Sequence, residues 1–222
     1  MFLTVLNVKI SLSIEDALNF RSIGRIADRV RNLEGLIEEC NSLIRPVALY
    51  EYVGVEEVRL DGVRLRGNLM FTSSKLSEQF KCVEEIAAYI MTIGPYLERR
   101  VTELSSSRVL DSWILDNLGT CSLRLLSMVL EDRVESERGW RVSKFNPGST
   151  PTWDLCQQGV LFDIFSRRRV EEEVGVMLTE KFVMVPRKSS SGIFAPTEVK
   201  YHNCQDCQKI CEYRQAPYVE ST

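Results

Sequence analysis

The chain has 222 residues, of which 44% are apolar and 27% are charged, and its formal net charge is −3. This balance is typical of a folded globular protein with one large core, and it argues against nucleic acid as a partner. The apolar runs are too short to span a bilayer, and the start lacks the basic residues and cleavage site of a signal peptide. We therefore expect a cytoplasmic protein with no membrane partner.

The first third of the chain predicts a strand, a helical arm and a hairpin. Residues 2–10 alternate in polarity, which favours a strand, and a Ser-x-x-Asp capping box at Ser13 begins a short helix. Apolar residues at helical spacing over 24–44 predict a longer helix. Asp61 and Gly62 separate two alternating segments, which indicates a hairpin whose two-residue turn uses positive φ angles.

The rest of the chain mixes helices and strands without a regular βαβ alternation. This mixture favours an α+β fold with a mainly antiparallel, twisted sheet and helices packed on it. Trp153 and Phe162 are expected in its core. In chain order, the patterns predict a helix over 74–82, a buried strand over 86–94, helices over 95–104 and 108–137, a loop over 143–154, a helix over 153–166, a solvated surface stretch over 167–173, and two or three short strands over 174–195.

Four of the seven cysteines are scattered and three are clustered. The scattered cysteines have apolar neighbours, so we expect them to be buried and inert, and the odd total argues against a disulfide scaffold. A reducing compartment fits this usage. The scattered cysteines are Cys40, Cys82, Cys121 and Cys156.

The clustered cysteines lie near the carboxyl end, shortly after the single histidine, His202. Cys204, Cys207 and Cys211 fall within eight residues. Thiolates select zinc or iron–sulfur clusters, and with His202 the set reaches the four ligands of a tetrahedral zinc site. Three cysteines with an open position suit an iron–sulfur cluster instead. The alternatives are a reduced tail without a metal and a purely redox pair of thiols.

Residues 178–192, LTEKFVMVPRKSSSG, resemble the activation domain of cobalamin-dependent methionine synthase. That family has a leucine-threonine-glutamate start, then an aromatic residue, a methionine, a proline and serine-x-serine-glycine at the same spacing. Residues 146–149, NPGS, stand where the family has a proline-glycine-tyrosine loop. The likeness covers roughly residues 85–202 and extends to stand-alone, single-domain relatives, some of which end in a cysteine-rich tail.

The resemblance implies a domain organisation and a function. The domain spans 1–203, with a helical arm and hairpin at 1–72 and a core at 73–203, and a cysteine-rich tail follows at 204–222. The family's domain binds S-adenosylmethionine and presents its methyl group to oxidised cobalamin while a separate electron donor reduces the cobalt. The resemblance thus implies the activation part of a 5-methyltetrahydrofolate–homocysteine methyltransferase, assisting reductive methylation of a separate cobalamin-carrying protein or methyltransferase.

A domain of this kind supplies no catalytic acid or base of its own, and it acts by positioning the sulfonium methyl group. The alternative is a non-enzymatic scaffold, or a metal-binding partner of a corrinoid protein, that no longer binds S-adenosylmethionine. Substitutions in the ligand residues that the resemblance identifies favour this alternative.

Four of those ligand residues lie in the loop. Lys144 stands where the family has an arginine that pairs with the ligand's carboxylate, so the charge is kept and the bidentate fork is lost. Asn146 replaces an alanine, and Ser149 replaces a tyrosine and its stacking face. Gly148 is retained, and its missing side chain lets the backbone approach a ligand closely.

The other ligand residues that the resemblance implies follow the last strand. The family has lysine-tyrosine-tyrosine there, and this chain has Lys200, Tyr201 and His202. Arg124 stands near a position where the family's long helix carries a glutamate. Each lost contact costs about 1 kcal/mol or more, so three losses weaken binding about a hundredfold.

Overall fold

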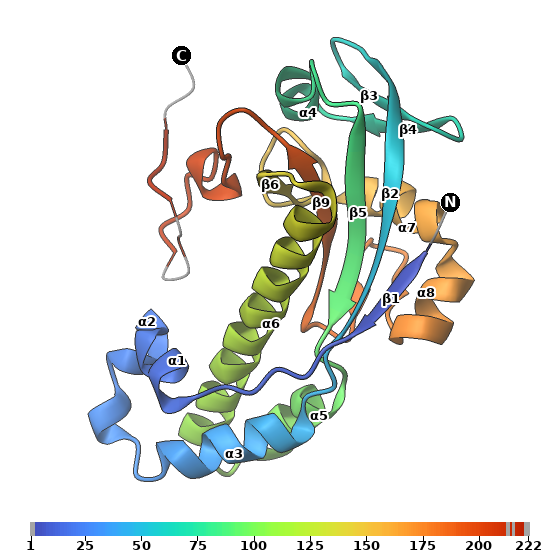
Figure 1. Ribbon diagram of the computed structural model, residues 1–222. Coiled ribbons are helices and arrows are strands. Elements are labelled where there is room, and N and C mark those ends of the chain that lie inside the picture. Colours follow the sequence, from blue (N-terminus) through green and yellow to red (C-terminus); the bar gives the residue numbers. More distant parts are fainter. Residues whose placement is uncertain (1–2, 212–213, 215, 220–222) are drawn as a thin grey trace.

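The computed structural model describes residues 3–211, 214 and 216–219. Its main sheet has seven antiparallel strands in the order β4-β3-β2-β5-β9-β6, with β1 beside β2, and β7 and β8 form a separate pair (Figure 1). The strands are β1 (Thr4–Asn7), β2 (Val47–Val58), β3 (Gly62–Leu65), β4 (Leu69–Thr72), β5 (Glu85–Thr92), β6 (Val142–Phe145), β7 (Met177–Leu178), β8 (Met184–Val185) and β9 (Ser189–Pro196).

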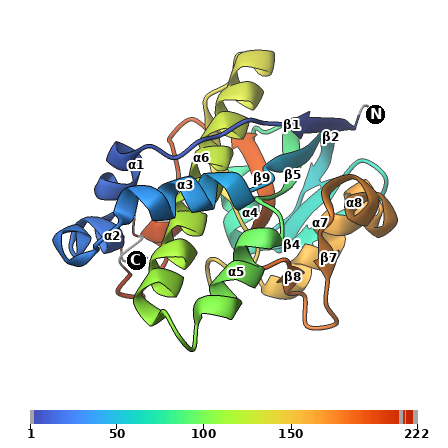
Figure 2. The ribbon, with the colours of Figure 1, turned by 90° about the horizontal axis from the view of Figure 1, so that it is seen from below.

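Helices cover both faces of the sheet, with α3, α5 and α6 on one side and α7 and α8 on the other (Figure 2). In the described residues the helices are α1 (Ile14–Asn19), α2 (Arg21–Gly24), α3 (Leu33–Leu43), α4 (Ser74–Gln79), α5 (Tyr96–Leu104), α6 (Val109–Arg138), α7 (Gln158–Phe165) and α8 (Arg167–Val174), and the short 3₁₀ turns are η1 (Ala27–Arg29), η2 (Leu155–Gln157) and η3 (Asn203–Gln205).

The central strand β5 divides two hydrophobic cores. Tyr89 and Met91 point into the core under α6, whereas Ala88 and Ile90 point into the core under α7 and α8. This alternation is the period of two expected of a strand buried on both faces. The predicted α+β fold with an antiparallel sheet and packed helices is therefore confirmed.

The predicted hairpin is present, but its turn is shifted by one residue. Residues 60–61 form the turn and Gly62 already belongs to β3, with neither Asp61 nor Gly62 at positive φ. Gly62 is required for another reason, since a Cβ there would collide with the carbonyl oxygen of Phe71 on β4. Positive φ angles occur instead at Gly67 and Asn68, in a second hairpin between β3 and β4 that the patterns did not predict.

The predicted helix over 24–44 is broken, and this expectation is wrong at its start. The regular helix α3 begins at Leu33, where the side chain of Asn32 accepts a hydrogen bond from the Gly35 amide. By contrast, the capping box at Ser13 is confirmed, since Ser13 and Asp16 each accept from the other's backbone amide. The arm of α1–α3 packs on α6 within one hydrophobic core, while the predicted domain boundaries stay a prediction.

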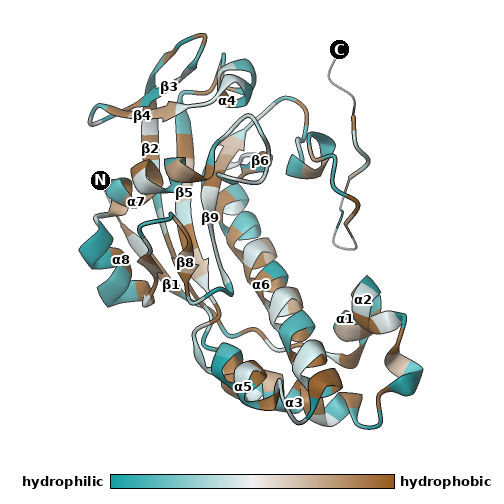
Figure 3. Ribbon diagram, turned by 180° about the vertical axis from the view of Figure 1, so that it is seen from behind, coloured by the Kyte–Doolittle hydropathy of each residue, from teal (hydrophilic) through white to brown (hydrophobic). Residues whose placement is uncertain are grey.

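Two segments have regular structure that the patterns did not predict, although residues 167–173 are exposed as expected except for Val170. Residues 167–173 belong to α8, which buries Val170 and Val174 one turn apart while its outer face is charged (Figure 3). The predicted loop over 143–154 begins as a strand, because β6 pairs with β9. Helix α6 passes Gly119 without a break, and a Cβ there would come within 2.8 Å of Leu97 Cδ2 on α5.

Core predictions are confirmed for aromatic residues and half confirmed for the scattered cysteines. Trp153 and Phe162 are buried. The four scattered thiols divide into two exposed and two buried: Cys82 and Cys156 are exposed, against expectation, and Cys40 and Cys121 are buried. Within the described part of the chain, the longest helices are too polar to cross a membrane.

Candidate functional site

Two adjoining pockets meet at Lys144 and His202, and we call them together the groove. The helix pocket, about 480 Å³, lies between the middle of α6 and the strands β5, β6 and β9. The loop pocket, about 790 Å³, lies between residues 146–151 and 203–209. The groove thus runs from the long helix, past the end of β6, to the start of the tail.

Lys144 provides a buried cation at the junction of the pockets. Strand β6 holds its backbone beside Phe194, and its Nζ donates to Ser127 Oγ on α6 at 2.7 Å. The ammonium also lies 5.7 Å from the centre of the Tyr89 ring. Burial lowers the pKa of Lys144 to about 8, a shift that the carboxylate of Glu131 partly opposes. An anionic ligand group beside Lys144 would raise this pKa again.

Asn146 fastens the loop to the sheet and to the tail. Its Nδ2 donates to the Tyr89 hydroxyl at 2.6 Å and to the Ser191 carbonyl at 2.7 Å. Its Oδ1 accepts from Asn203 Nδ2 at 2.9 Å. Because both ends of the amide are already bonded, Asn146 shapes the loop pocket more than it offers groups to a ligand.

Gly148 and Ser149 form the bend that walls the loop pocket. Gly148 has φ +76°, and its amide donates to the Trp153 carbonyl at 2.8 Å. A Cβ at this position would come within 2.8 Å of Leu155 Cδ1. Glycine is therefore required here by the turn and by Leu155, which is a different reason from the close approach to a ligand that the sequence suggested.

Tyr201 and His202 lie at the floor of the groove in different ways. The Tyr201 ring stacks on Phe145 with the ring centres 4.8 Å apart, and its hydroxyl donates to Asp206 at 2.8 Å. Burial raises the pKa of Tyr201. Tyr201 lines the helix pocket and not the loop pocket, and its ring belongs to the core under α7 and α8. His202 lines both pockets and pairs with Lys144 through a parallel β-bridge. Of these two residues, only His202 lines the loop pocket together with residues of the 146–149 bend.

A polar stripe on α6 lines the helix pocket, and only Arg124 among its residues was identified from the sequence. Its residues face the helix pocket at offsets of four, seven and eleven, which is one face of a helix. Glu131 also forms an ion pair with Lys200 at 2.6 Å. Polar residues at helical spacing among apolar neighbours were the available signal. The stripe consists of Thr120, Arg124, Ser127 and Glu131.

The clustered cysteines separate into two places. Cys204 and Cys207 line the loop pocket, whereas Cys211 lies in another depression, beside Arg21 of α2. Among residues 3–211, 214 and 216–219, no three histidine, cysteine or acidic side chains are placed to hold a metal ion. The zinc or iron–sulfur site stays a prediction that this geometry does not support.

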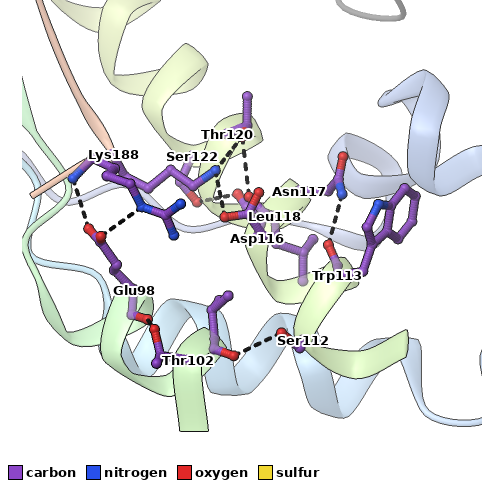
Figure 4. A network of polar contacts seen from close by, with 12 residues as sticks. Glu98, Thr102, Ser112, Trp113, Asp116, Asn117, Leu118, Thr120, Ser122 and Lys188 are labelled. Atoms are coloured by element: carbon purple, nitrogen blue, oxygen red, sulfur yellow. Dashed lines mark hydrogen bonds and ion pairs between the residues drawn. The ribbon is translucent and has the colours of Figure 1, made fainter. Parts of the chain in front are cut away.

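Two of the three cations in the resembling motif at 178–192, Arg187 and Lys188, form ion pairs with side chains of α5 and α6 (Figure 4). Lys188 Nζ donates to Thr120 Oγ1 at 2.8 Å and lies 3.0 Å from Asp116 Oδ1, both on α6. The amide and guanidinium of Arg187 both donate to Glu98 on α5 at 2.8 Å. The motif therefore anchors the start of β9 to two helices, which agrees with the expected strand and turn.

Comparison with known proteins gives a structural match and no sequence match. No protein-family model and no curated protein matches the sequence. A solved structure described as the MetH reactivation domain bound to AdoHcy superposes with a TM-score of 0.66 and 13% identity, over 91% of this chain and 81% of that chain. At this identity the match establishes similarity of fold alone: the chain is similar in fold to the MetH reactivation domain.

Proposed function

We propose that this chain binds S-adenosylmethionine in the groove and assists the reductive methylation of a corrinoid methyltransferase. The main support is the position of the residues that the family resemblance assigned to the ligand. The residues concerned come from two segments that are distant in the sequence, and each lines one or both of two pockets that share Lys144 and His202. They are Lys144, Asn146, Gly148, Ser149, Tyr201 and His202. A structure of the same fold carries AdoHcy, the demethylated form of the proposed ligand.

The charges of the groove suit a zwitterionic ligand. The Lys144 ammonium would hold the ligand's carboxylate, and Glu131 and Asp132 of the helix pocket would attract its ammonium. Among the described residues, no acidic side chain lines the loop pocket, which leaves that side for uncharged parts of the ligand. The sulfonium supplies the methyl group, and the chain binds and orients it.

Calorimetric titration with S-adenosylmethionine and AdoHcy tests this proposal. We expect a Kd below about 1 mM for the wild-type chain, and about a hundredfold weaker binding for Lys144→Met because a charge-assisted contact is lost. Lys181→Met is the matched control, since Lys181 is exposed and lines neither pocket. Equal affinity in Lys144→Met would remove the lysine from the site.

A scaffold without S-adenosylmethionine binding is the second candidate. It is favoured by the Asn146 amide, which is already bonded at both ends, and by Tyr201, whose ring is packed on Phe145. Affinity no better than millimolar, together with capture of a cobalamin-loaded methyltransferase by the intact chain, would support this candidate. Binding of the ligand without capture would count against both the scaffold and the proposed partner.

A further inference from the structure

Cys204 and Cys207 lie one hydrogen-bonded turn apart in the wall of the loop pocket. The Cys207 amide donates to the Cys204 carbonyl at 3.4 Å, directly after η3. The Cα atoms at the two ends of such a turn lie within about 7 Å of each other. A disulfide joins Cα atoms about 4.4–6.8 Å apart, so little backbone movement is needed to link the two sulfurs.

Arg214 braces both ends of this turn. Its guanidinium donates to the Cys204 carbonyl at 2.8 Å and to the Cys207 carbonyl at 2.6 Å. The same group donates to the carbonyls of Lys209 at 2.7 Å and Ala216 at 3.3 Å. A planar guanidinium with several bonded donors holds its acceptors in a fixed arrangement. The two cysteines are therefore held together by the tail itself.

The third clustered cysteine is placed differently. Cys211 is exposed and lies beside Arg21 of α2, while Cys204 and Cys207 are half-buried in the loop pocket. Only two of the three thiols thus share a cavity. This arrangement is that of a pair of thiols and not of a three-cysteine ligand set.

We propose that Cys204 and Cys207 form a reversible dithiol–disulfide pair in the wall of the groove. The oxidant class is a low-molecular-mass disulfide. One cysteine thiolate attacks it and releases one small thiol, and the second cysteine thiolate then displaces the other small thiol. Two protein thiols and one small disulfide give one protein disulfide and two small thiols, with both electrons passing to the small molecule.

Redox titration of the full chain with oxidised and reduced glutathione tests the pair. After equilibration and alkylation, peptide mass spectrometry should find one intramolecular disulfide, between Cys204 and Cys207. The exposed Cys82 and Cys156 should carry glutathione at most. Cys207→Ser should abolish the intramolecular bond and leave a glutathione adduct on Cys204. A bond involving Cys211, adducts without an intramolecular bond, or no reaction would each overturn the proposal.

Arg214→Gln tests the brace. We expect the effective concentration of one thiol at the other to fall about tenfold. The midpoint reduction potential of the pair should then rise by about 30 mV, because the disulfide is less stable. The matched control is Arg168→Gln on the exposed face of α8, which should leave the midpoint unchanged. An equal midpoint in both variants would overturn the role of Arg214. No ligand is present in these titrations, so their result is independent of whether the groove binds S-adenosylmethionine.

Discussion

Replacing Lys144 by methionine should stabilise the fold while it weakens ligand binding. Burial lowers the pKa of Lys144 from 10.5 to about 8. The folded chain therefore binds this proton less tightly than the unfolded chain, so the charged lysine destabilises the fold below pH 8. This penalty is relieved as the pH rises from 8 to 10.5. Methionine has a similar length and carries no charge.

The size of the effect follows from the shift and from the bond that is lost. A shift of this size corresponds to about 3 kcal/mol at pH 7, falling to about 1.5 kcal/mol at pH 9.5. Loss of the bond from Nζ to Ser127 opposes the gain by about 1 kcal/mol. The variant should thus be more stable by about 2 kcal/mol at pH 7 and by less than about 0.5 kcal/mol at pH 9.5.

Urea unfolding at the two pH values measures this difference. The slope of free energy against urea should be the same for both proteins, since the exposed surface changes little. Lys181→Met, at an exposed position, should change stability by less than about 0.5 kcal/mol at either pH. Stability equal to or below that of the wild type at pH 7, or an advantage that does not depend on pH, would refute the account of a buried charge.

Three further predictions concern the groove. The affinity for S-adenosylmethionine should fall about tenfold per pH unit above about pH 8, because Lys144 loses its proton there. Calorimetry in two buffers should detect uptake of a proton on ligand binding near pH 8. An unchanged affinity at pH 9.5 would contradict this prediction. Gly148→Ala should lower the free energy of unfolding by about 2–4 kcal/mol, because it adds a steric clash with Leu155 to the strain of positive φ. Gly175→Ala, at φ +70° with open space around it, should lower it by about 1–2 kcal/mol. Equal losses of stability in thermal unfolding would argue against the clash. Asn146→Ala should lower the free energy of unfolding by about 2–3 kcal/mol, because it removes three hydrogen bonds. Asn203→Ala removes one of these bonds and should lower it by about 1 kcal/mol. Similar losses in both variants would show that the bonds to Tyr89 and Ser191 contribute little.

Local signals predicted those elements that depend on local contacts. The capping box at Ser13, the buried strand around Ala88 and the long helix through Leu118 each have a pattern within one short window. Residues 167–173 have only one apolar residue among six charged ones, so α8 was missed; its helix depends on burying Val170 and Val174 against the sheet.

The sequence predicted candidate site residues but not how the chain arranges them. The Pro-Gly signal at 147–148 correctly indicated an irregular bend, but it concealed the strand before it, whose pairing partner β9 lies about fifty residues later. A separate parallel bridge brings Lys144 beside His202. Distances of this kind depend on the sheet order, which a single sequence does not contain.

The bond between Asn146 and Asn203 has a consequence for regulation. Asn203 directly precedes Cys204, so one amide–amide contact links the bend at Gly148 to the thiol pair. Thermodynamic reciprocity then applies. If oxidation of the pair changes the ligand affinity of the groove by some factor, a bound ligand changes the equilibrium constant for oxidation by the same factor. The same coupling constant must therefore emerge from binding curves of the oxidised and reduced chain and from redox curves with and without ligand.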